Sequence, residues 1–140
     1  LDSRSFLTGN PGWQGSNTFV DLRLMLQAGG FREGLLSLND RDLALRLLRQ
    51  PGAAWRLTGR WTATWFADTP GNLSEPGSRA KREGLRAFWT LYGAEMRPDE
   101  RVGFFRRARQ LFGISADEIQ GGEAGSSPVL GFPGGACACA

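Results

Sequence analysis

Helical spacing of apolar residues, set between start and stop signals, is the feature that most constrains the fold of this chain. Residues 78–92 place four large apolar residues in the i, i+3, i+4, i+7 pattern of one helix face: Leu85, Phe88, Trp89 and Tyr92. Pro98 suits the first position of a second helix over residues 98–112. A capping box at Ser115 and Glu118 indicates a third, short helix. The C-terminal half therefore predicts three successive helices.

The sequence pattern of the N-terminal half predicts two more helices. The first is expected over residues 19–28, capped by Asn17 or Thr18 and ended by a Gly-Gly pair. The second is expected to begin at Asn39 or Asp40 and to stop before a Pro-Gly pair. Its acidic residues lie in the first turn, where they complement the helix dipole. Five helices are the upper estimate for the chain.

Residues 55–65 change to a period of two. Trp55, Trp61 and Trp65 share one side of the alternation, with Thr and Arg on the other side. This pattern predicts a strand or hairpin with one buried face. Because a lone strand is not stable, it must fold back at Gly59 or pair with another edge, including an edge of another chain. The Trp face is expected to be core, and contact with a partner is the alternative.

Both ends of the chain are rich in Gly, Pro and Ser. We expect residues 1–17 to form an irregular arm on the surface, residues 18–120 a single mainly helical domain, and residues 121–140 a flexible tail. The predicted fold is therefore mainly α: a small domain of four to five helices with one Trp-rich strand or hairpin and irregular N- and C-terminal arms.

The chemistry available for catalysis is sparse. The 140 residues include no histidine, which is the commonest general base and a frequent zinc ligand. The acidic pairs lie at predicted helix starts, where capping explains them. Cys137 and Cys139, in the tail, are only two of the four ligands that a complete structural metal site needs. We therefore predict that the protein is not an enzyme and has no metal site and no cofactor.

Basic residues suggest a second kind of partner. All but one of the 17 basic residues are Arg, and the formal net charge is +3. This charge permits an acidic partner without demanding one. Six arginines of the predicted C-terminal helices could contact phosphates, although a solvated helix face is the preferred explanation: Arg82, Arg86, Arg101, Arg106, Arg107 and Arg109.

The sequence favours a non-catalytic accessory subunit that binds other protein subunits within a larger multi-subunit assembly, with an organelle as one location left open. This hypothesis rests on the irregular arms, the unpaired strand and a helix over residues 98–112 that is apolar on two sides. The residues expected to contact partners are aromatic: Trp13, Trp55, Trp61, Trp65, Phe104 and Phe132.

Two alternatives are left open. The first is a basic protein that associates with nucleic acid through its Arg-rich helices. The second is a precursor or redox protein with a functional Cys-Ala-Cys tail. The chain begins at Leu1 rather than Met, which favours an organelle or exported location if a segment was removed; otherwise the location is left open.

Overall fold

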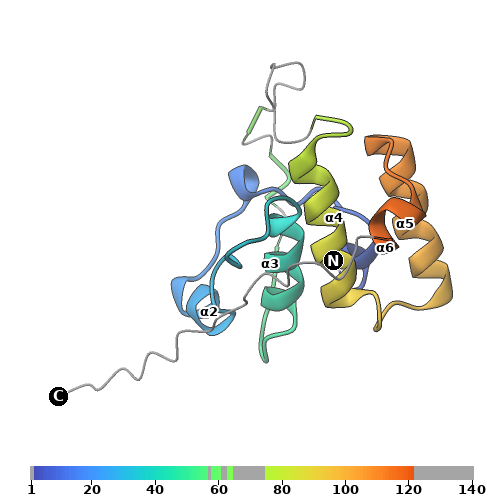
Figure 1. The fold of residues 1–140 in the computed structure, drawn as a ribbon. Helices are drawn as coiled ribbons and strands as arrows, with labels where there is room; N and C mark the ends of the chain where they lie inside the picture. Colours follow the sequence, from blue (N-terminus) through green and yellow to red (C-terminus); the bar gives the residue numbers. More distant parts are fainter. Residues whose placement is uncertain (1, 57, 61–62, 65–74, 122–140) are drawn as a thin grey trace.

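The computed structural model describes residues 2–56, 58–60, 63–64 and 75–121. These residues are mainly helical, which confirms the predicted class, and they contain no strand (Figure 1). The elements in chain order are α1 Ser5–Thr8, the 3-10 helix η1 Gly15–Asn17, α2 Leu22–Gln27, α3 Asn39–Leu48, α4 Arg79–Tyr92, α5 Pro98–Phe112 and α6 Ala116–Gln120.

The three C-terminal helices form where the sequence predicts them. The hydroxyl of Ser78 caps α4, and Pro98 is the first residue of α5. Gly113 ends α5 in the left-handed conformation, with φ at 67°. Ser115 and Glu118 form the expected capping box of α6. Local signals are thus sufficient to define these elements.

The two N-terminal helices differ in detail from their predicted limits. α2 is shorter than predicted, because Asp21 caps it: the carboxylate accepts the backbone N–H of Arg23 at 2.7 Å. α3 begins at Asn39, but the residue before it is Leu38 in a left-handed conformation, with φ at 65°. Neither Asn39 nor Asp40 therefore stands at the capping position.

The predicted Trp-rich strand is not supported. Of residues 55–65, the structure describes 55, 56, 58–60, 63 and 64, and none of these is in a strand. Gly59 has φ at 67°, which interrupts an extended chain. Trp55 is 43% exposed rather than buried. Trp61 and Trp65 lie outside the described residues. Period-two spacing alone cannot form a sheet without a partner strand.

The N-terminal segment enters the core, so the prediction of an irregular surface arm is wrong for its first half. α1 lies between α3 and α5 and buries Phe6 and Leu7 completely (Figure 1). Burying a side chain of this size contributes about 1.5–3 kcal/mol, which outweighs the low helix propensity of the surrounding residues. The predicted domain boundary at residue 17 stays a prediction.

Two clusters of buried apolar residues hold the helices together. The smaller cluster joins α2 to α3 through Ala28, Leu43 and Leu47, and the half-buried Trp13 packs against both clusters. The larger cluster joins α1, α3, α4, α5 and α6: Phe6, Leu7, Leu38, Ala44, Leu45, Leu85, Phe88, Tyr92, Met96, Phe104, Ala108, Ile114 and Ile119.

A buried carboxylate ties α3 to α4 and to the loop after α2. Asp42 is fully buried and accepts hydrogen bonds from Arg32 at 3.1 Å, Arg46 at 2.7 Å and the Tyr92 hydroxyl at 2.5 Å. Arg46 also donates to the carbonyl oxygens of Ala28 and of the nearby Gly30. The end of α2 is therefore fixed on α3 by hydrogen bonds as well as by apolar packing.

Within the described part of the chain, no helix has the length and apolarity needed to cross a membrane.

Candidate functional site

α2 is apolar around most of its circumference, and among the described residues only part of this surface packs on another element. Leu24 and Met25 are half-buried and pack against the cluster that Ala28 forms with Leu43 and Leu47 of α3. This packing is needed, because a helix of only six residues gains little stability unless it packs on a neighbour.

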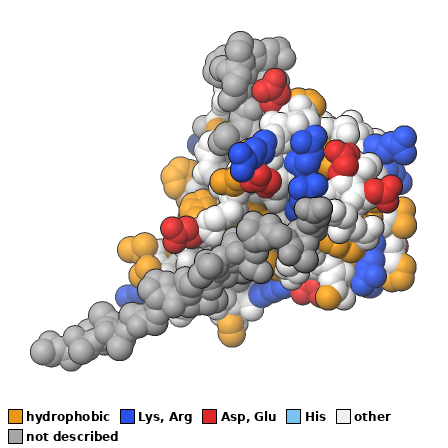
Figure 2. Space-filling model, in the orientation of Figure 1, with side chains coloured by type: hydrophobic (Ala, Val, Ile, Leu, Met, Phe, Trp, Pro, Cys, Tyr) orange, Lys and Arg blue, Asp and Glu red, His pale blue; other side chains and the backbone are white. Residues whose placement is uncertain are grey.

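The opposite side of α2 faces solvent. Phe19, just before the helix, is 94% exposed, and Leu22 and Leu26 are each 70% exposed. Leu22 and Leu26 are spaced i, i+4 on one side of α2, as anchor residues are in helices that dock into apolar grooves, and Phe19 precedes the helix. We call Phe19, Leu22 and Leu26 the α2 face. Figure 2 shows hydrophobic side chains at the edge of the molecule where α2 lies.

The sequence predicts a helix here but not which of its apolar residues are buried. The apolar surface of residues 19–28 is too wide for one contact, since the cluster with α3 takes up only the side that carries Leu24 and Met25. The signal for an exposed face was the width of this apolar surface on a short helix. The long helix α5 also carries an exposed apolar residue: Val102 is 64% exposed, although α5 packs against α1, α4 and α6.

The predicted aromatic contacts have different fates. Phe104 is buried and packs against Phe88 and Trp89, so it cannot contact a partner, and that prediction is wrong. Its position in the sequence of α5 does not reveal this, because the side that is buried depends on α4. Trp13 meets Phe6 edge to face, with ring centroids 5.9 Å apart, and is half-buried.

Of the remaining aromatic candidates, Trp55 is exposed. Trp61, Trp65 and Phe132 lie outside the residues that the structure describes. Trp13 packs against the cluster that joins α2 to α3, whereas Trp55 packs against neither apolar cluster of the described residues. These residues stay predictions as partner contacts.

Three of the predicted phosphate-binding arginines make contacts within the protein. Arg82 forms an ion pair with Glu118 at 3.3 Å, and Arg86 donates to the carbonyl oxygen of Glu118 at 2.7 Å. Arg101 donates to the Met96 carbonyl oxygen at 3.0 Å. These contacts hold α6 on α4 and the start of α5 on the preceding loop.

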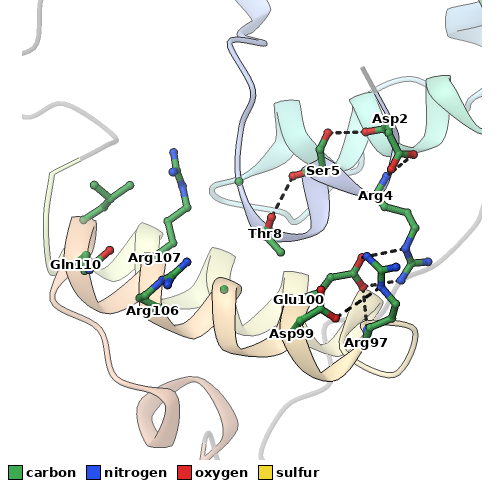
Figure 3. A pocket seen from close by; sticks show the side chains of 13 residues that line it. Asp2, Arg4, Ser5, Thr8, Arg97, Asp99, Glu100, Arg106, Arg107 and Gln110 are labelled. Carbon is green, nitrogen blue, oxygen red and sulfur yellow. Dashed lines mark hydrogen bonds and ion pairs between the residues drawn. The ribbon is translucent and has the colours of Figure 1, made fainter.

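The other three arginines, Arg106, Arg107 and Arg109, are exposed on α5. None of them has a hydrogen-bond or ion-pair partner among the described residues. Arg106 and Arg107 line a pocket of about 520 Å³ between α1 and α5, whereas Arg109 does not (Figure 3). The sequence predicted these cations as an anion-binding set but gave no sign of the pocket.

The acidic side of this pocket is already neutralised. Glu100 accepts Arg4 Nε at 2.9 Å and forms an ion pair with Arg97 at 3.0 Å. The hydrogen bond from Arg4 is the main reason that the pKa of Glu100 lies below its ordinary value, and burial opposes it. Asp99 also lies near Arg97, at 3.7 Å. This end of the pocket is a closed set of ion pairs between α1 and α5.

Metal-binding groups are not assembled in the described ranges, where no three His, Cys, Asp or Glu side chains lie close enough together to hold an ion. Cys137 and Cys139 fall outside these ranges, so the tail hypothesis stays a prediction. Comparison of the chain with protein-family models, curated proteins and solved structures gives no match in any of the three.

Proposed function

We propose that this chain is a non-catalytic accessory subunit that binds another protein through the α2 face. The observation that carries the proposal is the exposure of Phe19, just before α2, and of Leu22 and Leu26 on α2, whose other side packs on a small apolar cluster with α3. Large contiguous apolar patches on a protein surface often mark protein-binding sites. The partner is a protein with an apolar groove that receives one side of a helix.

The energetics favour an anchor within a larger interface. Burial of one large apolar side chain contributes about 1.5–3 kcal/mol, so three contribute on the order of 5–9 kcal/mol. Association itself costs at least about 4 kcal/mol. The α2 face is therefore expected to supply the central contact, with surrounding residues excluding water.

Charge contributes little to this contact. Asp21 and Arg23, next to the α2 face, carry opposite signs, so the complex should survive high salt because apolar burial is not screened. The nucleic-acid hypothesis predicts the opposite, since phosphate contacts weaken steeply with salt. That alternative now rests on Arg106, Arg107 and Arg109.

The test is the native size of the full chain, by gel filtration at low and high salt, with mass spectrometry of the co-eluting proteins. Leu22→Asp removes an anchor while placing an acidic residue in the first turn of α2, where the helix tolerates it. Val102→Asp is the matched control, because Val102 is 64% exposed on α5.

We expect a salt-resistant complex larger than the 15.3 kDa chain, lost with Leu22→Asp and kept with Val102→Asp. The proposal fails if the unaltered chain elutes at its own mass in both salts, or if Leu22→Asp leaves the complex intact. Release by salt together with nucleic acid would instead favour the arginine surface.

A further inference from the structure

The pocket between α1 and α5 has the size of a small-molecule site. Its volume is about 520 Å³, and such sites commonly occupy about 300–1,000 Å³. Its charges are separated along its length (Figure 3). The end at Arg97, Asp99 and Glu100 is paired with itself and with Arg4. The end at Arg106, Arg107 and Gln110 carries positive charge without a described counter-charge.

Arg107 is placed by the end of α1. A side-chain carbon added at Gly9 would lie 3.7 Å from Arg107 Cζ, so the guanidinium passes close over this glycine. Figure 3 shows Arg107 extending towards the α1 chain, with Arg106 and Gln110 at the same end of the pocket. These are the donors that a phosphate group uses: planar guanidinium groups bind its oxygens in pairs, and a side-chain amide adds one N–H.

A buried cation lies behind α1. Arg41 is buried and donates to the carbonyl oxygens of Phe6 and Leu7 rather than to a carboxylate of the described chain. Burial lowers the pKa of the Arg41 guanidinium, and repulsion by Arg107 lowers it further. The fold thus concentrates positive charge on both sides of α1, and an anion beside Arg107 would offset it.

The middle of the pocket supplies acceptors. The Ser5 hydroxyl donates to the Asp2 carbonyl oxygen at 2.5 Å, and the Thr8 hydroxyl donates to the Ser5 carbonyl oxygen at 3.4 Å. Because both protons are used, the two hydroxyl oxygens are left to accept hydrogen bonds. A ligand body that carries hydroxyl groups matches this surface.

We propose that this pocket binds a small phosphate monoester, with the phosphate held by Arg106 and Arg107 and a hydroxylated body lying over Ser5 and Thr8. The site is separate from the α2 face, and its occupation does not depend on the protein partner proposed above. The ligand is a soluble compound or the headgroup of a phosphorylated lipid, which present the same chemistry.

Isothermal titration calorimetry of the full chain tests the proposal, with glycerol 3-phosphate and inorganic phosphate as probes at an ionic strength held constant with chloride. We expect one site that binds glycerol 3-phosphate more tightly than inorganic phosphate. Arg107→Gln and Arg106→Gln should each weaken binding about tenfold or more, because each removes charge-assisted hydrogen bonds.

Arg109→Gln is the matched control. It makes the same change in charge on the same helix, outside the pocket, and should alter binding by less than about twofold, since an exposed charge without direct contact is screened. Equal weakening by Arg109→Gln would overturn the proposal, because a diffuse basic surface would explain it. So would binding of the probes no tighter than that of chloride.

Two further binding experiments distinguish a lipid headgroup from a soluble phosphate compound, and either of these from a nucleic acid. If the protein binds vesicles of phosphatidylcholine with phosphatidic acid, and glycerol 3-phosphate competes with this binding, the ligand is a lipid headgroup. If the protein binds the soluble probe but not the vesicles, the ligand is a free metabolite. A single-stranded oligonucleotide that binds more tightly than either, and is weakened equally by all three Arg→Gln variants, overturns the pocket in favour of a nucleic-acid surface.

Discussion

The Tyr92 hydroxyl of α4 donates a hydrogen bond to the carboxylate of Asp42 on α3 at 2.5 Å, inside the core. The same carboxylate accepts from Arg32 and Arg46. One buried anion thus satisfies two cations and a phenol from different parts of the chain. Because Arg46 also holds the loop after α2, this cluster supports the helix that carries the proposed protein-binding face.

Asp42→Asn should strongly destabilise the protein. The substitution keeps the size of the side chain but leaves Arg32 and Arg46 without their counter-charge, and breaking a buried ion pair in this way costs about 3–5 kcal/mol. Urea denaturation measures the free energy of unfolding. Glu95→Gln is the control, because its ion pair with Arg49 is on the surface and contributes less than about 1 kcal/mol. Equal effects of the two substitutions would contradict the assigned role of Asp42.

The free energy of unfolding should fall at high pH, because the buried Tyr92 hydroxyl must lose its proton there. Burial, with help from the hydrogen bond to Asp42, raises the pKa of Tyr92 to about 12 from an ordinary value of 10. The folded state therefore keeps the proton that the unfolded state loses first. The stabilisation is complete below about pH 10 and is lost as the pH rises towards 12.

Tyr92 is the only tyrosine in the chain, so ultraviolet absorbance of the tyrosinate reports its titration directly. We expect the midpoint well above that of the urea-unfolded chain. Tyr92→Phe should flatten the fall of the unfolding free energy between about pH 10 and 12. A tyrosinate midpoint that is the same in the folded and unfolded chains would refute this account.

The parts of the fold that sequence predicts are those with local signals. Ser78, Pro98 and Ser115 mark the starts of α4, α5 and α6, and each acts on residues within one helical turn. α1 has no comparable signal, because Phe6 is held by α3 and α5 and by Arg41, 35 residues away in the chain. Only long-range packing reveals it.

The candidate sites, too, are visible in the sequence only where their signals are local. The basic character of Arg106 and Arg107 is visible in the sequence, but their grouping with Ser5 and Thr8 requires α1 to pack on α5. The exposed side of α2 could not be chosen from the sequence, because most of its circumference is apolar and the position of α3 decides which part is covered.

Arg41→Met should release α1 without unfolding the rest of the domain. Methionine keeps the apolar stem in place but loses the hydrogen bonds to the Phe6 and Leu7 carbonyl oxygens, at 2.7 and 2.9 Å. Each buried carbonyl left without a partner costs about 1–3 kcal/mol locally. Removal of an unpaired buried charge offsets part of this cost for the domain as a whole.

Hydrogen exchange of the backbone amides resolves the two effects of Arg41→Met. Exchange should become faster over residues 5–9 and change little in α4. Arg49→Met is the control, because Arg49 is exposed and pairs with Glu95 on the surface. If protection of α1 is the same in both variants, Arg41 does not hold the N-terminal segment.

Gly84 and Gly103 form a matched pair for testing the helix contacts. Both lie inside helices, where replacing glycine by alanine favours the helix by about 1 kcal/mol. At Gly84 of α4, the new side-chain carbon would lie 2.6 Å from Ser37 Cβ and 2.8 Å from the Ser37 backbone oxygen. The backbone cannot move away freely, because Ser37 is also held by Lys81 at 2.7 Å. At Gly103 of α5, the nearest atom is the Thr8 methyl carbon at 3.3 Å, which can shift by rotation.

We therefore expect Gly84→Ala to destabilise the domain by about 1–3 kcal/mol, as overpacking does, and Gly103→Ala to be neutral or stabilising. Thermal unfolding measures the difference: each kcal/mol corresponds to about 3–5 °C in Tm for a domain of this size. A Gly84→Ala variant that melts at or above the unaltered protein would show that α4 does not approach Ser37 as closely as the structure has it. The proposed order of Tm is Gly103→Ala at or above the unaltered chain, and Gly84→Ala below it, because the two sites gain equally in helix propensity and differ only in the contact that the new carbon meets.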